Sequence, residues 1–393
     1  MTINIRPTYK LLTGDIRELT EEIGEVSCIV TSVPYFHQRK YGDSDLEVGR
    51  EADVVTYIDG LVSIFSALHV HKLGSIWVNI SDKRRNGALL NIPARFSQSM
   101  IEAGFRLVDE VIWAKAAVRE DGSTVGHCMT EKCLQRINGN AHEYLYRFTL
   151  SKDAWCDAMA VQIPRSNVES IRYLPSDLMS CETAINGRSP PNVWQIGQGQ
   201  THEHHYAVYP TTLVERPIAM ACPLFVNPDG SLPRRHVEWI EYDEGRKGSR
   251  AIGKVDPCAS VEKKGRHDNA RQYIPRMPVS VGWDSVMDGA RAGVVLDPFC
   301  GTSTTGAVAL KLGRSYIGVD LYAENVEISQ RRCSQAMSYV DANYGYDKVY
   351  EMIMVNQQGQ KANLTSERSN GKIEQAQVPV RDLDELFTFE GGA

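Results

Sequence analysis

The sequence lacks any apolar run long enough to cross a membrane, and residues 1–6 lack the pattern of a signal peptide. It also lacks paired cysteine spacings: the nine cysteines are scattered, and their odd number fits reduced thiols better than a disulfide framework. Positive charge is not in excess, because the net charge is −6, so any surface that binds nucleic acid must be local. These absences predict a cytoplasmic protein.

A standard zinc pattern is missing as well. His202, His204 and His205 lie close together, with Cys222 and His236 downstream, but their spacing does not match that of zinc ligands. We therefore expect no metal. What the chain does contain is enough apolar sequence for a large core, since 42% of its 393 residues are apolar and 23% are charged.

Residues 293–313 have the pattern of a strand, a loop and a helix. Apolar residues lead into Asp297, a turn rich in glycine, threonine and serine follows, and a short amphipathic helix ends at Gly313. A second apolar run, residues 315–319, ends in Asp320. Acids at the carboxyl ends of neighbouring parallel strands are typical of nucleotide sites in open α/β sheets, where the later acid reaches a ribose hydroxyl. The pattern predicts an adenosine-type ligand.

A second unusual stretch follows the apolar run of residues 26–30. The strand ends at Ser32, and a rigid unit of Val33 and Pro34 leads to the aromatic Tyr35. Pro34 forces Val33 into an extended conformation, so the Ser32 hydroxyl and the neighbouring backbone carbonyls point at one spot beside a flat aromatic face. Two acceptors and a stacking surface suit the exocyclic amino group of a base turned out of a duplex.

Together, residues 31–35 and 297–306 resemble the catalytic and cofactor motifs of the S-adenosylmethionine-dependent DNA amino-methyltransferases. The catalytic motif comes first and the cofactor motif late, which is similar to the β-arrangement of that family. The serine at the head of the catalytic motif, Ser32, is similar to the cytosine-N4 members, whereas adenine-N6 members more often begin this motif with Asp or Asn. The resemblance covers most of residues 10–335.

The resemblance implies S-adenosylmethionine as cofactor and double-stranded DNA as substrate, and it suggests a cognate restriction endonuclease and a second copy of the chain, in a homodimer, as partners. The catalytic residues that it implies are Ser32, Val33, Pro34 and Tyr35. The cofactor-binding residues that it implies are Asp15, Thr31, Asp297, Pro298, Phe299, Gly301, Ser303, Thr304 and Asp320.

Two positions depart from the family pattern. Val33 stands where the family usually has proline, but its backbone carbonyl still supplies an acceptor. Ser303 stands where the family usually has glycine, and it adds a side chain where the loop is expected to pass close to the cofactor, so it puts cofactor affinity in question. Asp15 resembles the acid that contacts the adenine of the cofactor, and it is also expected to cap a helix that begins near Ile16.

Helical and strand patterns alternate along the chain, which predicts an α/β fold with a doubly wound, mostly parallel sheet. The resemblance makes this a Rossmann-like methyltransferase fold with a permuted motif order and an inserted recognition region. Thr211 or Thr212 is expected to cap the helix of the third unit. The expected units are a catalytic half (residues 1–150), a target-recognition region (151–205), a cofactor-side helix (206–223), a basic insertion that contacts DNA (224–290), a cofactor-binding half (291–345) and a polar, poorly ordered tail (346–393).

Phosphate contact is expected from cations outside the two motifs. Residues 234–276 carry eleven cations and seven acids, which is a local excess of positive charge in an otherwise acidic protein. A soluble insertion without a role in DNA binding is the alternative for this segment. The candidate DNA-binding residues are Arg39, Lys40, Arg84, Arg165, Arg172, Arg188, Arg234 and Arg235.

The predicted reaction is methyl transfer to the N4 amino group of a flipped cytosine, whose lone pair is freed when acceptors hold both amino hydrogens out of the ring plane. Adenine-N6 transfer uses the same fold and stays open. Carbon-5 cytosine methylation would need Cys258 after Pro257 as nucleophile, but this pair has no strand-end context. Residues 31–35 also argue against two further alternatives, a nucleotide-dependent oxidoreductase and a non-catalytic DNA-binding relative.

Overall fold

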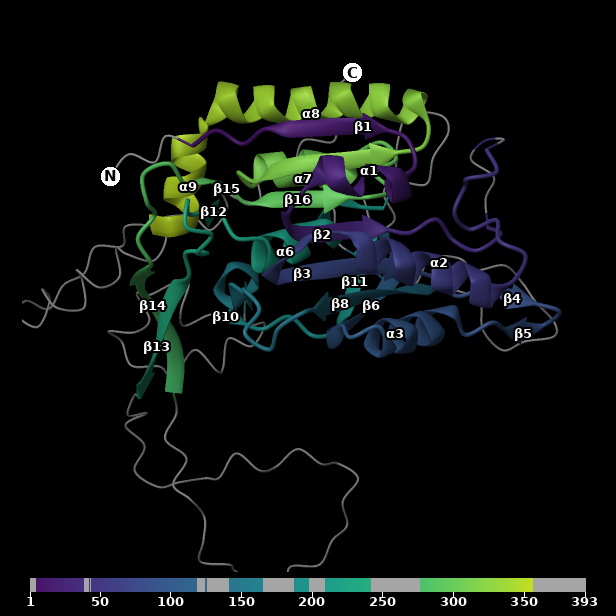
Figure 1. Cartoon of the computed structure of the whole chain (residues 1–393). Coiled ribbons are helices and arrows are strands. Elements are labelled where there is room, and N and C mark those ends of the chain that lie inside the picture. Colours follow the sequence, from purple (N-terminus) through teal and green to yellow (C-terminus); the bar gives the residue numbers. More distant parts are fainter. Residues whose placement is uncertain are drawn as a thin grey trace, which may run out of the picture.

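The structure is a computed structural model that describes residues 5–38, 42, 44–118, 124–125, 141–164, 187–197, 209–241 and 276–355 (Figure 1). Its central element is a sheet in which β8 (His142–Thr149) runs antiparallel to both neighbours, whereas the other neighbouring strands along the sheet are parallel. The short β7 (Thr124–Val125) pairs antiparallel with β6 (Arg106–Val118). In spatial order the strands are β1 (Tyr9–Thr13), β17 (Ser315–Asp320), β16 (Val294–Asp297), β2 (Val26–Ser32), β3 (Val70–Ile80), β8 (His142–Thr149), β6 (Arg106–Val118) and β11 (Val193–Gly197).

This strand order brings both sequence motifs to one edge of the sheet. β16 lies between β17 and β2, with Leu296 opposite Ile29. Asp297 at the end of β16 and Ser32 at the end of β2 therefore lie on adjacent strands. Because β8 runs in the opposite direction, its first residues lie at this edge too. The carboxyl edge of a parallel sheet is where α/β proteins bind ligands, so the fold places the site there.

Helices cover both faces of the sheet (Figure 1). β3 shows the alternation that produces two buried faces: Ile76 and Val78 pack in one core, whereas Trp77 between them packs in the other. This arrangement confirms the predicted doubly wound, mostly parallel α/β fold. The helices of the first face are α1 (Ile16–Ile23), α2 (Val54–Ala67) and α3 (Ile92–Glu102), and those of the second are α6 (Thr211–Ala221), α7 (Thr304–Lys311) and α8 (Ala323–Asn343).

Short antiparallel pairs lie outside the central sheet. One of them, β13 with β14, stands away from the sheet as an arm (Figure 1). Residues 242–275, which carry most of the charge of the predicted basic insertion, lie outside the described residues. The pairs are β4 (Arg84–Arg85) with β5 (Ala88–Leu89), β9 (Ile163–Pro164) with β10 (Gly187–Arg188), β12 (Phe225–Val226) with β15 (Arg291–Ala292), and β13 (Arg235–Glu241) with β14 (Arg276–Trp283).

Two predicted boundaries and one predicted helix cap differ from the structure. β11 joins the central sheet beside β6, so residues 193–197 belong to the core and not to a separate recognition region. The tail does not begin at residue 346, because α9 (Tyr346–Val355) follows α8, and Tyr350 is buried against Phe225. Neither Thr211 nor Thr212 caps α6, since the helix begins after Pro210, whose carbonyl accepts from the Leu213 amide.

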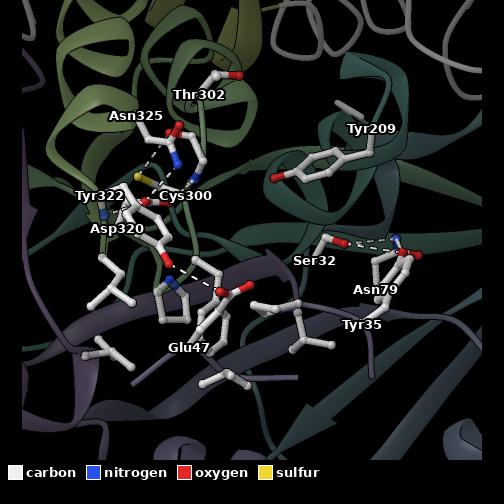
Figure 2. Close-up of a pocket in the computed structure, with 18 of the residues that line it drawn as sticks. Ser32, Tyr35, Glu47, Asn79, Tyr209, Cys300, Thr302, Asp320, Tyr322 and Asn325 are labelled. Atoms are coloured by element: carbon white, nitrogen blue, oxygen red, sulfur yellow. Dashed lines mark hydrogen bonds between the residues drawn. The ribbon is translucent and has the colours of Figure 1, made fainter. Parts of the chain in front are cut away.

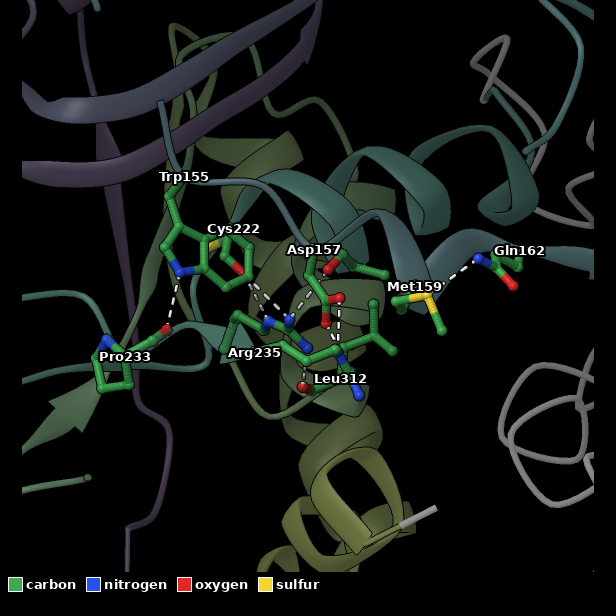
Figure 3. Close-up of polar contacts among 10 residues, drawn as sticks. Trp155, Asp157, Met159, Gln162, Cys222, Pro233, Arg235 and Leu312 are labelled. Atoms are coloured by element: carbon green, nitrogen blue, oxygen red, sulfur yellow. Dashed lines mark hydrogen bonds and ion pairs between the residues drawn. The ribbon is translucent and has the colours of Figure 1, made fainter. Parts of the chain in front are cut away.

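The predicted phosphate contact of Arg235 is wrong, because its guanidinium is buried in an ion pair (Figure 3). Arg235 Nε and Nη2 donate to the two carboxylate oxygens of Asp157 at 2.8 and 2.7 Å, and both side chains are 3% exposed. The guanidinium also lies over the ring of Trp283, with Cζ 4.5 Å from its centroid. Arg235 therefore anchors the base of the arm to the body. The 3₁₀ turn η1 (Ala158–Val161) directly follows Asp157.

Removing one partner of this buried pair is expected to destabilise the fold. We expect Arg235→Met to lower the free energy of unfolding by about 3–5 kcal/mol, because the Asp157 carboxylate would be left buried without its counter-ion. The matched control is Arg6→Met, which breaks the exposed pair of Arg6 with Asp341 and should cost about 1 kcal/mol or less. Urea titration of both variants measures this. Equal losses would contradict a buried, structural Arg235.

Candidate active site

Both motifs line one cavity of about 420 Å³ at the carboxyl edge of the sheet. Figure 2 shows two groups of side chains in it: Asp320, Tyr322 and Asn325 gather at one end, which we call the Asp320 end, and Ser32 and Asn79 gather at the other, the Ser32 end. The predicted site residues on the cavity wall are Asp15, Ser32, Val33, Pro34, Tyr35, Pro298, Phe299, Gly301, Thr304 and Asp320.

Three predicted cofactor contacts lie behind this wall instead. Thr31, Asp297 and Ser303 are at most 2% exposed, and their side chains make hydrogen bonds to other protein groups. These three residues are not on the cavity wall, and their role in cofactor binding stays a prediction. Their contribution is to hold the cavity wall in place.

Asp297 joins the ends of β2 and β16. Its Oδ1 accepts from the Thr31 hydroxyl at 2.6 Å and from the Phe299 amide at 3.2 Å. Its Oδ2 accepts from the Thr305 hydroxyl at 2.8 Å and from the Tyr209 hydroxyl at 3.1 Å. Complete burial raises the pKa of Asp297 to about 6, although these four donors act to lower it.

This raised pKa predicts a pH dependence of stability. The native carboxyl, with a pKa of about 6, holds its proton more tightly than the unfolded one, whose pKa is 3.8. Unfolding therefore becomes easier as the pH rises from about 4 to about 6, and the contribution is constant above that. Asp297→Asn cannot ionise. We therefore expect its free energy of unfolding, relative to that of the wild type, to rise by about 3 kcal/mol as the pH increases from about 4 to about 6. Urea midpoints at pH 4 and 7 test this. Asp59→Asn, at an exposed position, is the control. The prediction would be contradicted if the difference in stability between Asp297→Asn and the wild type were the same at both pH values.

Ser303 does not intrude on the cavity. Its backbone is left-handed, with φ of 57°, and its Oγ lies 3.2 Å from the Tyr316 hydroxyl in the core. The Ser303 side chain is therefore directed away from the cavity, and its effect on cofactor affinity stays a prediction. Gly301, two residues earlier, does lie on the cavity wall; it has φ of 50° and no atom within 4 Å of the position where a Cβ would lie.

Asp320 organises the turn at its end of the cavity. Its Oδ2 accepts from the Gly301 amide at 2.9 Å, and its Oδ1 accepts from the Tyr322 amide and from Asn325 Nδ2, both at 2.9 Å. Burial raises the pKa of Asp320 despite these donors. Asn325 Oδ1 is a buried acceptor with no hydrogen-bond partner among the described residues. This end of the cavity can thus accept hydrogen bonds from ligand hydroxyl or amino groups.

Asp15 both caps α1 and faces the cavity. It accepts from the Arg17 amide at 2.9 Å, which confirms the predicted cap, and its carboxylate pairs with the Arg17 guanidinium at 2.6 Å. Arg17 also donates to the Leu46 carbonyl at 2.9 Å, and the Tyr322 hydroxyl donates to Glu47 at 3.3 Å. These contacts hold the loop around residues 44–50 over the Asp320 end. Nothing in the local sequence pattern marks Arg17, Glu47 or Asn325 as site residues.

A polar network surrounds Ser32 and Tyr35. The Tyr35 hydroxyl donates to Glu143 Oε2, which also accepts from Asn79 Nδ2 at 2.7 Å. Asn79 Nδ2 lies 2.8 Å from the Tyr35 hydroxyl and 3.3 Å from Ser32 Oγ. Lys115 Nζ pairs with Glu143 Oε1 at 2.6 Å. Burial, and then the Glu143 charge, raise the pKa of Tyr35 well above its usual value, so the phenol stays protonated.

Strand order explains how this network forms. Asn79 lies opposite Ser32 in the β2–β3 pair, and Glu143 lies opposite Trp113 in the β8–β6 pair. Lys115 is two residues beyond Trp113, so both side chains are on one face of β6. The sequence motifs do not indicate Asn79, Lys115 or Glu143 as site residues. The sequence signal that could have indicated one of them is Asn79, a polar residue near the end of an otherwise apolar strand.

The remaining candidates for DNA binding are only partly described. Arg84 lies in the β4–β5 hairpin, whose Lys83 donates to the His37 carbonyl just after the catalytic motif. Arg234 donates to the Asp153 carbonyl at 2.7 Å. Arg188 lies in β10, where only its backbone is described. Arg39, Lys40, Arg165 and Arg172 lie outside the described residues.

Two other candidate sites from the sequence are also outside that part of the chain, namely His202, His204 and His205, and the pair Pro257 and Cys258. In the described ranges no group of three or more His, Cys, Asp or Glu side chains could hold a metal ion. No helix of the described ranges has both the length and the apolar character needed to span a bilayer.

The chain belongs to the N6_N4_Mtase family of DNA methylases, because the sequence profile of that family matches residues 26–224 and 287–331. The two matched segments contain both motifs and leave out most of the basic insertion. The protein is therefore an S-adenosylmethionine-dependent DNA amino-methyltransferase, and the predictions of its family and of its cofactor are confirmed.

Individual relatives match over most of the chain at low identity. The type II methyltransferase M.SmaI of Serratia marcescens is 22% identical, over 84% of this chain and 91% of its own. The type II methyltransferase M.Cfr9I of Citrobacter freundii is 23% identical, over 82% of this chain and 86% of its own. Among solved structures, the PvuII DNA methyltransferase, described as cytosine-N4-specific, is 17% identical with a TM-score of 0.47, over 93% of this chain and 97% of that one.

Proposed function

We propose that the protein is a site-specific methyltransferase that modifies the exocyclic N4 amino group of a flipped cytosine in duplex DNA. The observation that carries this proposal is the position of Ser32, whose hydroxyl lies on the wall of the same cavity as Asp320. Serine offers a small neutral acceptor to an amino group, and serine heads this motif in the family members that modify cytosine. Tyr35 beside it offers the aromatic face on which the flipped base stacks.

The chemistry asked of the chain is mainly positioning. The amino nitrogen of cytosine is a poor nucleophile because its lone pair is delocalised into the ring. Ser32 Oγ and the Val33 carbonyl accept the two amino hydrogens and draw them out of the ring plane, which frees the lone pair for in-line attack. Asn79 donates toward Ser32 Oγ at 3.3 Å, and the Ser32 hydroxyl donates to the Tyr35 hydroxyl at 3.4 Å, so one lone pair of Oγ is left to accept from the base. No covalent enzyme intermediate is needed.

The Asp320 end suits the adenosine part of the cofactor. Bound S-adenosylmethionine supplies a methyl group on a positively charged sulfur. Asp320 would accept from a ribose hydroxyl, and the unpartnered Asn325 Oδ1 is a further buried acceptor for its hydroxyl or amino groups. Asp15 faces the same end and would accept from the adenine amino group, while Gly301 lets the backbone approach closely.

Duplex DNA would be held by cations around the cavity. Arg84 lies on a hairpin tied to the turn that follows Tyr35, and the arm of β13 and β14 leads into the basic segment. The names of the relatives, type II methyltransferases, support a restriction-modification setting. A cognate endonuclease, a homodimer and a cytoplasmic location stay predictions.

The test is nucleoside mass spectrometry on DNA from a methylation-free host that expresses the chain. We expect N4-methylcytosine. N6-methyladenine would keep the mechanism and overturn the choice of base, and 5-methylcytosine would move the chemistry to Cys258. If the purified protein binds S-adenosylmethionine and modifies neither DNA base, the DNA-directed proposal fails and RNA becomes the substrate to examine.

A further inference from the structure

We infer that Lys115 reads the ring edge of the flipped base, donating to an acceptor next to the amino group, and that Glu143 holds Lys115 in position for this contact. The inference deepens the proposed function and rests on it, because it assumes that the base enters at the Ser32 end of the cavity. It assigns a role in base choice to a strand that neither motif includes.

Lys115 is fixed in position by its neighbours, and its ammonium group still has N–H donors that Glu143 does not use. Its Nζ lies 2.6 Å from Glu143 Oε1, and the side chain lines the cavity while only 20% exposed. An ammonium group has three N–H donors, so one bond to Glu143 leaves donors for a ligand. The ring of Trp113 lies below, with its centroid 5.4 Å from Nζ, and its own N–H donates to the Ile196 carbonyl at 3.0 Å. Lys115 is thus confined from two sides.

Glu143 is not available to the base in the same way. Its Oε1 faces Lys115, and its Oε2 already accepts from the Tyr35 hydroxyl and from Asn79 Nδ2. The residue is 5% exposed. The Ser32 end therefore offers two kinds of polar group. Ser32 and the Val33 carbonyl are acceptors for an amino group, whereas Lys115 is a cationic donor.

This division matches cytosine better than adenine. Next to its amino group, cytosine presents two consecutive acceptors, N3 and O2. On the corresponding Watson–Crick edge, adenine presents one acceptor, N1, followed by the C2–H group. A confined cation gains more from the longer acceptor edge, and a base without matching acceptors would leave the N–H donors that do not bond to Glu143 desolvated and without an acceptor. Lys115 thus adds selectivity that Ser32 by itself does not supply.

The test combines Lys115→Met with a substrate that lacks the ring acceptors. The methylated site is first mapped on plasmid DNA by sequencing. Duplex oligonucleotides then carry either cytosine or a 4-aminophenyl C-nucleoside at the target position, and the latter keeps the amino group but has neither N3 nor O2. We expect Lys115→Met to lower kcat/KM about 100-fold on cytosine and less than about threefold on the analogue. Equal losses on both substrates, or no loss on cytosine, would overturn the inference.

A second variant separates base contact from a disturbed network. In Lys115→Met combined with Glu143→Gln, both charges are gone and the amide can still bond to Tyr35 and Asn79. Activity restored by the second change would show that Lys115 acts only by neutralising Glu143, and it would overturn the inference. We expect no restoration. Exposed Lys72→Met on β3 is the matched control and should leave both rates unchanged.

The identity of the product separates this inference from the proposed function. N4-methylcytosine from the wild type together with equal losses for Lys115→Met on both substrates would sink the inference alone. N6-methyladenine from the wild type would sink the proposed function, and with it the assignment of Lys115 to the edge of cytosine.

Discussion

Replacing Tyr35 with alanine is expected to lower kcat by about 100-fold or more while the Kd for S-adenosylmethionine changes less than about threefold. The ring lines the Ser32 end, so its loss would remove the stacking surface that we propose for the base. Its hydroxyl bonds to Glu143 and lies 2.8 Å from Asn79 Nδ2, so truncation also leaves two buried polar groups with one partner fewer. Single-turnover methylation measures the first effect, and calorimetric titration with the cofactor measures the second.

Tyr35→Phe is the matched control, because it keeps the ring and removes only the hydroxyl. If stacking carries most of the effect, this variant should lose about tenfold, well short of the loss in Tyr35→Ala. Equal losses in the two variants would instead assign the role to the hydroxyl and its network. Thermal unfolding of both variants checks that they are folded, so that a loss of activity cannot be explained by unfolding after the partly buried ring is removed.

Replacing Asp320 with alanine is expected to act on the other end of the cavity, raising the Kd for S-adenosylmethionine about 100-fold. The substitution would remove the carboxylate that we propose accepts from a ribose hydroxyl. It would also release the Gly301 and Tyr322 amides and Asn325 Nδ2, which Asp320 now holds at 2.9 Å, so the turn at the cavity wall would lose its support. Saturating cofactor should recover most of kcat.

Asp320→Asn separates these two contributions, since an amide keeps one acceptor for the turn and lacks the charge. A Kd between those of the wild type and Asp320→Ala is expected. The division of roles between the two ends would be contradicted if Tyr35→Ala and Asp320→Ala weakened cofactor binding equally.

Much of the active site follows from the sequence because its motifs are local. Apolar residues before Asp297 and before Ser32 indicate strands, and the residues after them indicate turns, so two strand ends with chemistry at their tips are visible without coordinates. The capping role of Asp15 is likewise a matter of neighbours two residues away. The motif did not indicate that the side chains of Thr31, Asp297 and Ser303 are buried behind the cavity wall, because a motif shows which residues are near a ligand and not where each side chain points.

Tertiary structure alone decided which distant residues complete the site. Tyr35 and Glu143 are 108 positions apart, and only the antiparallel β8, inserted between β3 and β6, brings Glu143 to the edge where Ser32 lies. Arg235 also shows that local sequence does not reveal contacts between distant residues. Local charge suggested an exposed phosphate contact, yet its partner Asp157 is 78 positions away and buries it.

The amino-acid sequence by itself thus determined the α/β class, the two motifs and the family they resemble, because periodicity and turn chemistry depend on residues close along the chain. The tertiary structure decided that Asn79, Glu143 and Lys115 lie at the site, that Arg235 is buried in an ion pair and that α9 packs on the core. Those outcomes depend on strand order and on burial, which are properties of the whole chain and are settled only when its cores close.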